Sequence, residues 1–241
     1  MGTMLPAGES TCQRARGGSR PRLGGVRRLL EFHRSPNSVK VRIALEYKGL
    51  EYETEEMYAA DRDPIVRAGG WPLVPILMDG AVTMRDSAAI LHYLEANYRD
   101  APTLTPDSRD DILTAEVLLA NVTPDIRRAQ WSVQPEIRKP PEERDGARIA
   151  AARETLVGSL ARLEARLSDR DWLVGTSMSL YDVILGCNLI PARPPRAFVN
   201  ASEIYRFFDE RMRIEAERPR VAAWVDRVLA HDSGAHRRAA H

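Results

Sequence analysis

VPILMDGAVTMRDSAAILHYLE (74–95) is the stretch that decides the fold of this chain. Two apolar runs flank Asp79-Gly80, and this dipeptide between such runs is the strongest short signal for a β-hairpin. Pro75 would begin the first strand, where a missing N–H is tolerated and a cis peptide bond is available. Asp86 and Ser87 are both favourable helix N-caps, and apolar residues follow at helical spacing. The stretch therefore predicts two antiparallel strands that lead straight into a helix.

A strand–helix–strand unit precedes this hairpin. RRLLEF (27–32) predicts a strand, residues 38–48 a helix that stops at Gly49, and YETEEM (52–57) a second strand. Strands joined by a helix pair in parallel, whereas the hairpin strands are antiparallel. Residues 58–73 predict a loop with room for a short helix. Residues 27–99 therefore form a thioredoxin-like domain with a mixed four-stranded sheet.

The second half of the chain predicts helices only. Residues 100–109 are a linker by composition. The expected helices cover 110–131, 142–167, a segment that begins at Ser179, 202–217 and 219–230. Ser179 and Asp182 form a capping box at the start of the third helix. The fold class is therefore an α/β domain followed by an all-α domain over residues 110–231.

The bulk composition excludes several protein classes. The 241 residues, 44% hydrophobic and 29% charged, suit a globular chain that folds without staples. A net charge of +1 gives no overall attraction to nucleic acid or anionic membrane. Cys12 and Cys187 indicate neither a disulfide framework nor a metal site, and no apolar run approaches the ~18–20 residues of a membrane span. We expect a cytoplasmic protein that uses no metal and binds neither nucleic acid nor membrane.

Both ends of the chain fall outside the two predicted domains. Residues 1–26 are rich in Gly, Pro and Arg and lack the apolar core of a secretory signal. We expect a disordered extension there, or a start codon assigned too early; the basic stretch 14–28 leaves contact with an anionic partner open. Residues 232–241 have the same polar character and predict a disordered tail.

Four motifs in this order resemble the cytosolic glutathione transferase family. SPNSVKVRIALEYKGLEYE (35–53) is similar to the first helix of serine-type members, especially the zeta class and an Asn-containing fungal and bacterial group. Val74-Pro75 resembles the cis-proline of the family, and Asp86-Ser87 resembles its acidic-Ser motif. WLVGTSMSLYDVIL (172–185) is similar to the segment with its Ser/Thr-x-x-Asp box. The resemblance spans about residues 27–231 and implies glutathione as co-substrate and a homodimer.

The resemblance implies that the loop Ser35–Ser38 stabilises the thiolate of glutathione. A free thiol titrates near ~8.5, and lowering its pKa by about 2 requires about 2.7 kcal/mol of thiolate stabilisation. A hydrogen bond to a charged acceptor gives about 1.5–3 kcal/mol and a helix N-terminus up to ~1 kcal/mol. Ser35 is implied as the residue that stabilises the thiolate, with the Asn37 amide as a second donor. Ser38 is the rival for the first task and is also the expected helix N-cap.

The family pattern also implies the residues that hold glutathione. The backbone of Val74 would pair with the cysteinyl part as an added strand, provided that the bond to Pro75 is cis. Ser87 at a helix start would bind the γ-glutamyl carboxylate, and Asp86 the ammonium group. The residue for the glycyl carboxylate stays unassigned, because this chain has Leu73 where the family has Lys, Arg or Gln.

The electrophile is expected between the two domains, against the helix 110–131. Its candidate contacts are Ile126, Gln130 and Trp131. Arg127 and Arg128 either meet an acidic co-substrate or form a solvated face.

Three functions are consistent with this sequence. The first is conjugation of glutathione to a small hydrophobic electrophile. The second is glutathione-dependent isomerisation of an unsaturated dicarbonyl acid, as in a maleylacetoacetate isomerase. Zeta-type members carry a second Ser and a Cys where this chain has Pro36 and Asn37, and this difference weighs against the isomerase function. The third is a non-catalytic binding module with the same fold.

Overall fold

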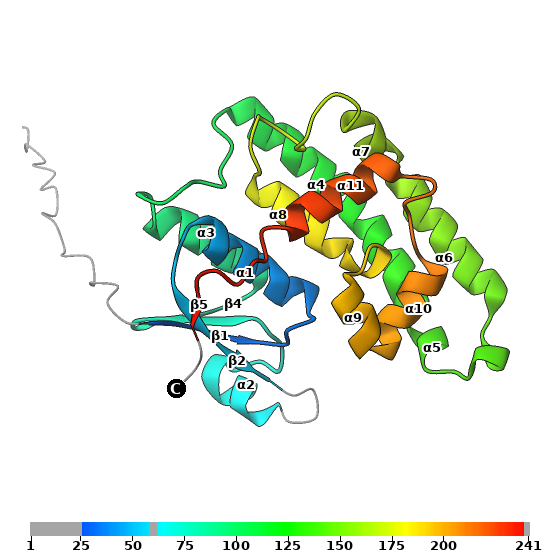
Figure 1. Cartoon of the computed structure of the whole chain (residues 1–241), viewed down its shortest axis with the longest axis horizontal. Helices are drawn as coiled ribbons and strands as arrows, with labels where there is room; N and C mark the ends of the chain where they lie inside the picture. Colours follow the sequence, from blue (N-terminus) through cyan, green and yellow to red (C-terminus); the bar gives the residue numbers. More distant parts are fainter. Residues whose placement is uncertain (1–25, 58–61, 239–241) are drawn as a thin grey trace, which may run out of the picture.

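The structure is a computed structural model that describes residues 26–57 and 62–238 (Figure 1). Residues 1–25, which hold Cys12 and all of the expected extension except Val26, lie outside the described residues. The first half contains β1 (Arg27–Glu31), α1 (Pro36–Tyr47), β2 (Tyr52–Glu56), α2 (Asp63–Gly69), β3 (Ile76–Asp79), β4 (Val82–Arg85) and α3 (Ser87–Asn97).

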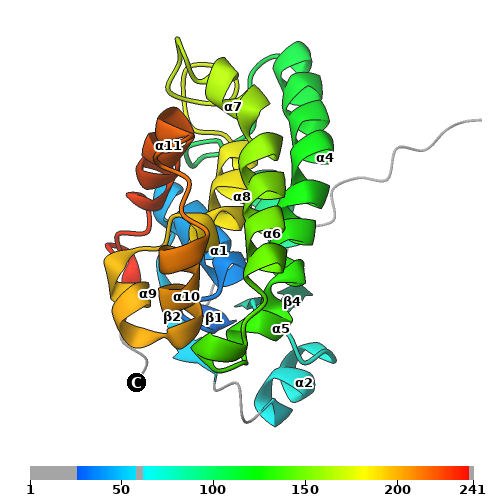
Figure 2. The same ribbon diagram turned by 90° about the vertical axis from the view of Figure 1, so that its right-hand side faces the viewer.

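Helices dominate the second half of the chain. They are α4 (Arg109–Ser132), α5 (Gln134–Ile137), α6 (Gly146–Ser159), α7 (Ala161–Arg166), α8 (Leu180–Asn188), α9 (Arg196–Ala201), α10 (Glu203–Arg211) and α11 (Pro219–Leu229), with 3-10 turns at Pro141–Glu143 and Ile190–Ala192. The fold class predicted from the sequence is confirmed: a mixed sheet with its helices is followed by a helical bundle. Figure 2 shows α4 and α6 side by side in this bundle.

The sheet has the strand order β4-β3-β1-β2-β5 in the part of the chain that the structure describes. β1 is parallel to β2 and antiparallel to β3, and β3 and β4 form the predicted hairpin. Gly80 in its turn has a φ of 60°, a left-handed conformation that glycine adopts without steric cost. In Figure 1, α1 and α3 cover the upper face of the sheet and α2 covers the lower face.

The fifth strand corrects the expectation of a disordered tail and of a four-stranded sheet. β5 (Arg237–Arg238) lies parallel to β2, and the backbone N–H of Tyr52 donates to the carbonyl of His236 at 3.1 Å. Asp232 accepts two hydrogen bonds from Arg42, from Nε at 2.8 Å and from Nη2 at 2.7 Å. Arg42 is fully buried and also pairs with Glu31. A buried guanidinium thus fixes the tail, through a contact that local composition does not reveal.

Helix boundaries differ from the prediction mainly in the bundle. The single helix expected over 142–167 is divided into a 3-10 turn, α6 and α7. Asp145 caps α6 by accepting from Arg148 N–H at 3.0 Å, which sets the start at Gly146. The hydroxyl of Ser159 donates to the carbonyl of Leu156 at 2.8 Å, and this local bond lies where α6 ends.

The capping box of α8 is confirmed. Ser179 accepts from the backbone N–H of Asp182, and the carboxylate of Asp182 accepts from the N–H of Ser179. The same carboxylate accepts from Leu173 N–H at 2.8 Å and from Trp224 Nε1 at 2.9 Å. α8 packs against α1, so this cap holds the helix that joins the bundle to the first domain.

Candidate functional site

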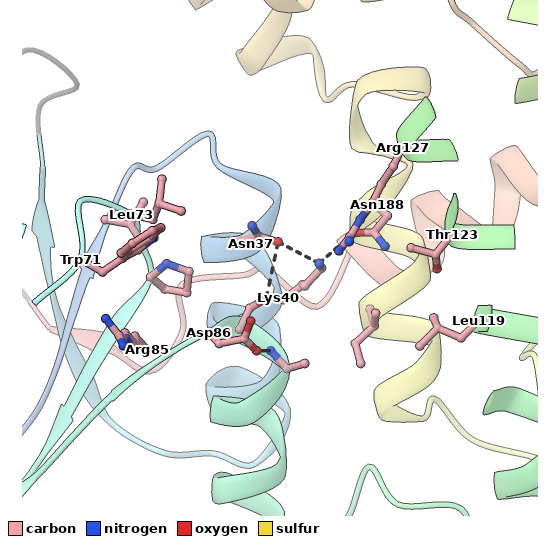
Figure 3. A pocket seen from close by; sticks show the side chains of 15 residues that line it. Asn37, Lys40, Trp71, Leu73, Arg85, Asp86, Leu119, Thr123, Arg127 and Asn188 are labelled. Carbon is pink, nitrogen blue, oxygen red and sulfur yellow. Dashed lines mark hydrogen bonds between the residues drawn. The ribbon is translucent and has the colours of Figure 1, made fainter. Parts of the chain in front are cut away.

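A cavity of about 530 Å³ lies between the first domain and the bundle (Figure 3). α1 contributes Asn37 and Lys40, and residues before β3 contribute Trp71, Leu73, Val74 and Pro75. The β4–α3 junction contributes Arg85, Asp86, Ser87 and Ala88; α4 contributes Leu119, Thr123 and Arg127; α8 contributes Ile184 and Asn188. Segments that are distant in the sequence therefore meet around one space.

Ser35 is the N-cap residue of α1. Its backbone is extended, with φ −71° and ψ 125°, and its side chain makes no capping hydrogen bond. Pro36 occupies the first helical position, where its fixed φ suits the helix and its missing N–H costs nothing. The hydroxyl of Ser35 therefore lies at the N-terminus of α1 without capping it. Ser35 does not itself line the described cavity.

Ser38 has a different place from the one expected. The prediction that it caps the helix is wrong, because Pro36 starts α1 earlier and puts Ser38 inside the first turn. Ser38 is fully buried, its hydroxyl has no hydrogen-bond partner among the described residues, and it does not line the cavity.

Asn37, Lys40 and Asn188 form a polar bridge between α1 and α8 in the wall of the cavity. Nζ of Lys40 donates to Oδ1 of Asn37 at 2.9 Å and to Oδ1 of Asn188 at 2.8 Å. The hydroxyl of Ser87 also reaches Oδ1 of Asn37, at 3.5 Å. Lys40 is only 3% exposed, and burial lowers its pKa to about 8. Residues from α1, α3 and α8 thus share one hydrogen-bond network.

The loop before β3 and the start of α3 have the predicted geometry. The Val74-Pro75 bond is cis. Asp86 has a φ of 73°, which is uncommon outside glycine and marks local strain. Its Oδ1 accepts from the N–H groups of Ala88 and Ala89, both at 3.0 Å. Asp86 is therefore the cap of α3 and also a wall of the cavity.

The wall formed by α4 lies on a different helix face from the one expected. Ile126 is fully buried in the core, Gln130 donates to the carbonyl of Asn188 at 2.7 Å, and Trp131 is 75% exposed. The cavity is lined instead by Leu119, Thr123 and Arg127, which recur every four residues and so share one face.

The two arginines of α4 have different surroundings. Arg128 pairs with Asp125 at 3.2 Å on the exposed face of the helix. Arg127 lines the cavity and has no ion-pair partner in the described residues 26–57 and 62–238. The hydroxyl of Thr123, one turn earlier, is buried and also lacks a partner there.

Sequence reasoning missed Lys40, Arg85, Thr123 and Asn188 as cavity residues. Only Lys40 carried a usable signal: it is one of three lysines in a chain whose other basic residues are arginines. Within the described segments, no group of three or more His, Cys, Asp or Glu side chains is arranged to hold a metal ion. No helix in those segments is long and apolar enough to cross a membrane.

Both halves of the chain match known domain families. Residues 29–107 match the family model described as glutathione S-transferase, N-terminal domain, and residues 146–227 match the corresponding C-terminal domain. The chain belongs to the glutathione S-transferase family. Within it, "Probable glutathione S-transferase GSTU6" of Oryza sativa subsp. japonica is 27% identical over 218 residues, 87% of this chain and 86% of that protein.

Two further relatives illustrate the range of similarity. "Glutathione S-transferase zeta class" of Euphorbia esula is 39% identical over 87 residues, 33% of this chain and 37% of that protein. The crystal structure of a glutathione S-transferase from Methylobacterium radiotolerans, in complex with glutathione sulfonate, is 27% identical. It superposes with a TM-score of 0.63 and covers 86% of this chain and 91% of that chain.

Proposed function

We propose that the cavity binds glutathione against the first domain, activates its thiol at the N-terminus of α1 and joins the sulfur to a small electrophile. The observation that carries this proposal is the meeting of three separate motifs at one cavity: Asn37 on α1, the Val74-Pro75 segment and the Asp86-Ser87 turn. Both domains belong to the glutathione S-transferase family, and the activity is that of a glutathione transferase.

Glutathione would lie along the edge of the first domain. The backbone of Val74 pairs with the cysteinyl part, as a strand added beside β3. Ser87 offers a backbone N–H and a hydroxyl to the γ-glutamyl carboxylate at the positive end of α3. Oδ2 of Asp86, which caps no backbone group, pairs with the ammonium group. Arg85 lines the same cavity and supplies a cation for the glycyl carboxylate that Leu73 cannot provide.

The chemistry requires a thiolate. The hydroxyl of Ser35 donates to the sulfur, the amide of Asn37 donates a second hydrogen bond, and the dipole of α1 favours the negative charge. The thiol proton passes to solvent, and the sulfur electron pair then forms a bond to an electron-poor carbon of the co-substrate. In a substitution the leaving group departs from that carbon with its bonding electron pair, as chloride does from chlorodinitrobenzene; in an addition the π electron pair moves to the neighbouring atom, which takes a proton from solvent.

The bundle side of the cavity indicates the kind of electrophile. Leu119 and Ile184 offer apolar contact, while Thr123 and Arg127 offer a hydroxyl and a guanidinium. A small electrophile with an apolar body and a polar or acidic group fits this wall. Isomerisation of an unsaturated dicarbonyl acid stays secondary, because the zeta-class relative matches only 33% of the chain.

We also propose a cytoplasmic homodimer. A chain with two cysteines suits a reducing compartment. Leu113 and Val117 lie four residues apart on α4 and are 49% and 59% exposed. Their spacing puts them on one face of the helix, where a partner subunit would cover both side chains. A monomeric mass in analytical ultracentrifugation would reject the dimer.

The experiment is a titration of bound glutathione, followed by the ultraviolet absorbance of its thiolate, together with conjugation to chlorodinitrobenzene. Wild-type protein should lower the thiol pKa by about 2 below its free value of ~8.5. Ser35→Ala should reduce kcat/KM by about 10- to 100-fold, as expected for the loss of about 1.5–3 kcal/mol. Ser38→Ala is the matched control and should retain activity. If wild-type protein binds no glutathione the proposal fails, and if only Ser38→Ala loses activity the role of Ser35 fails.

A further inference from the structure

Lys40 is a buried ammonium group with no carboxylate partner among the described residues. Its Nζ donates only to the neutral oxygens of Asn37 and Asn188, at 2.9 and 2.8 Å. Buried charges in proteins are normally paired, because an isolated charge is costly to remove from water. The position of Lys40 on the cavity wall therefore suggests that its counter-ion is a group that enters the cavity.

No carboxylate in the described segments makes a hydrogen bond or an ion pair with Lys40. Cys187 on α8 is completely buried, and burial raises the pKa of its thiol to about 12, so it stays neutral. Arg127 on α4 adds positive charge. Asp86 offsets part of the effect of burial on the pKa of Lys40, but it does not contact Lys40, and it uses one carboxylate oxygen to cap α3. Lys48, the C-cap residue of α1, has the usual arrangement: it is buried but donates to the carboxylate of Glu95 at 2.9 Å.

Lys40 also decides how the amide of Asn37 is oriented. An ammonium group can only donate hydrogen bonds, so the oxygen of Asn37 must face it and the NH₂ group must face away. The hydroxyl of Ser87 approaches the same oxygen at 3.5 Å and supports this orientation. Figure 3 shows the nitrogen of Asn37 on the side opposite to Lys40, toward Trp71 and Leu73. The amide donors are thus directed at the region assigned above to the cysteinyl part of glutathione.

We propose that Lys40 is a positioning residue that stabilises the thiolate of glutathione in two ways. It holds the Asn37 amide with its N–H groups toward the sulfur, and its positive charge is balanced by the thiolate. Asn188 completes the arrangement from α8, so the second domain contributes to the activation of the thiol. This inference rests on the proposed function, because it assumes that glutathione occupies the cavity.

Three substitutions separate the orientation of the amide from the charge. Lys40→Gln keeps a donor for the oxygen of Asn37 but removes the charge, and Lys40→Met removes both. Asn188→Asp leaves Lys40 in place and gives it a carboxylate, which competes with the thiolate. An opposite charge within ~4–6 Å shifts a pKa by about 1–3. We expect the pKa of the bound thiol to rise by about 1 in Lys40→Gln and in Asn188→Asp, and by about 2 in Lys40→Met.

The measurement is the thiolate absorbance of bound glutathione against pH, with the pH profile of kcat/KM beside it. Conjugation at neutral pH should fall about 10-fold or more in Lys40→Met and approach the wild-type rate above the free thiol pKa of ~8.5. S-methylglutathione, which has no thiol, should bind wild type and Lys40→Met equally well. Lys48→Met is the control and should leave the pKa of the bound thiol unchanged.

The outcomes distinguish this inference from the proposed function. If wild-type protein does not bind glutathione, both fail. If wild-type protein lowers the thiol pKa and Lys40→Met and Asn188→Asp lower it equally well, only the role of Lys40 is rejected. If Lys40→Gln equals wild type while Lys40→Met does not, the orientation of Asn37 is upheld and the contribution of the charge is rejected.

Discussion

Lys40→Met should make the ligand-free protein more stable. Burial lowers the pKa of Lys40 from 10.5 to about 8. At about 1.4 kcal/mol per pH unit, this difference corresponds to about 3 kcal/mol by which the charged side chain destabilises the fold at neutral pH. The oxygens of Asn37 and Asn188 lose a donor, which costs about 1 kcal/mol because both line a cavity that admits water. The expected gain in the free energy of unfolding is therefore about 2 kcal/mol.

The gain should depend on pH in a defined direction. Between the folded pKa of about 8 and the unfolded value of 10.5, the unfolded chain binds more protons than the folded protein. The stability of wild type therefore rises with pH across this window. The advantage of Lys40→Met should be complete below the folded pKa and lost above the unfolded one.

Urea unfolding of the ligand-free proteins, followed by far-ultraviolet circular dichroism from neutral pH to about pH 10, measures this difference. Lys48→Met, at the C-cap of the same helix, is the matched control. Lys48 is buried and donates to Glu95 and to the carbonyl of Pro102, both at 2.9 Å, so its loss leaves a carboxylate without its cation and should destabilise by about 3 kcal/mol. A Lys40→Met protein that is less stable than wild type, or a difference in stability that does not change with pH, would show that the buried charge of Lys40 does not destabilise the fold.

Two further predictions concern the tail and the co-substrate wall. Asp232→Asn should lower the free energy of unfolding by about 3 kcal/mol, because the buried Arg42 loses a charged acceptor of two hydrogen bonds. Arg238→Gln, which removes a solvent-exposed ion pair, should leave the urea midpoint unchanged. If both substitutions lowered the urea midpoint equally, the contact between Arg42 and Asp232 would not be what docks the tail. Arg127→Gln should raise KM for an electrophile with a carboxylate about 10-fold, or about 1.4 kcal/mol, and leave a neutral electrophile unaffected. Arg128→Gln should change neither KM, and a loss in both variants would assign the effect to general surface charge.

Features set by neighbours in the chain were predictable from the sequence. The hairpin at Asp79-Gly80 and the capping box of Ser179 and Asp182 each depend on residues a few positions apart. The fold class followed from the order of such local features. The N-cap of α1 was misplaced at Ser38, because both serines suit that position and only Pro36 decides between them.

Features set by distant packing were not predictable. The periodicity of α4 shows that one face is apolar, but it does not show which face the first domain approaches. Ile126 therefore seemed a candidate for the site, although the bundle buries it. The place of Lys40 in the site depends on its hydrogen bond to Asn188, which lies 148 residues away in the sequence. The docking of the tail depends on Arg42 in the same way.

The position of β5 has a consequence for how the protein is made. Arg42 is synthesised early, yet its carboxylate partner in the tail follows 190 residues later. Domains generally fold as they emerge during translation, N-terminal domain first. Here the first domain lacks β5, and its buried arginine lacks one partner, until residues 232–238 have left the ribosome. The sheet of the first domain is therefore completed only after the helical bundle has been synthesised, and the emergence of residues 232–238 becomes a step in its maturation.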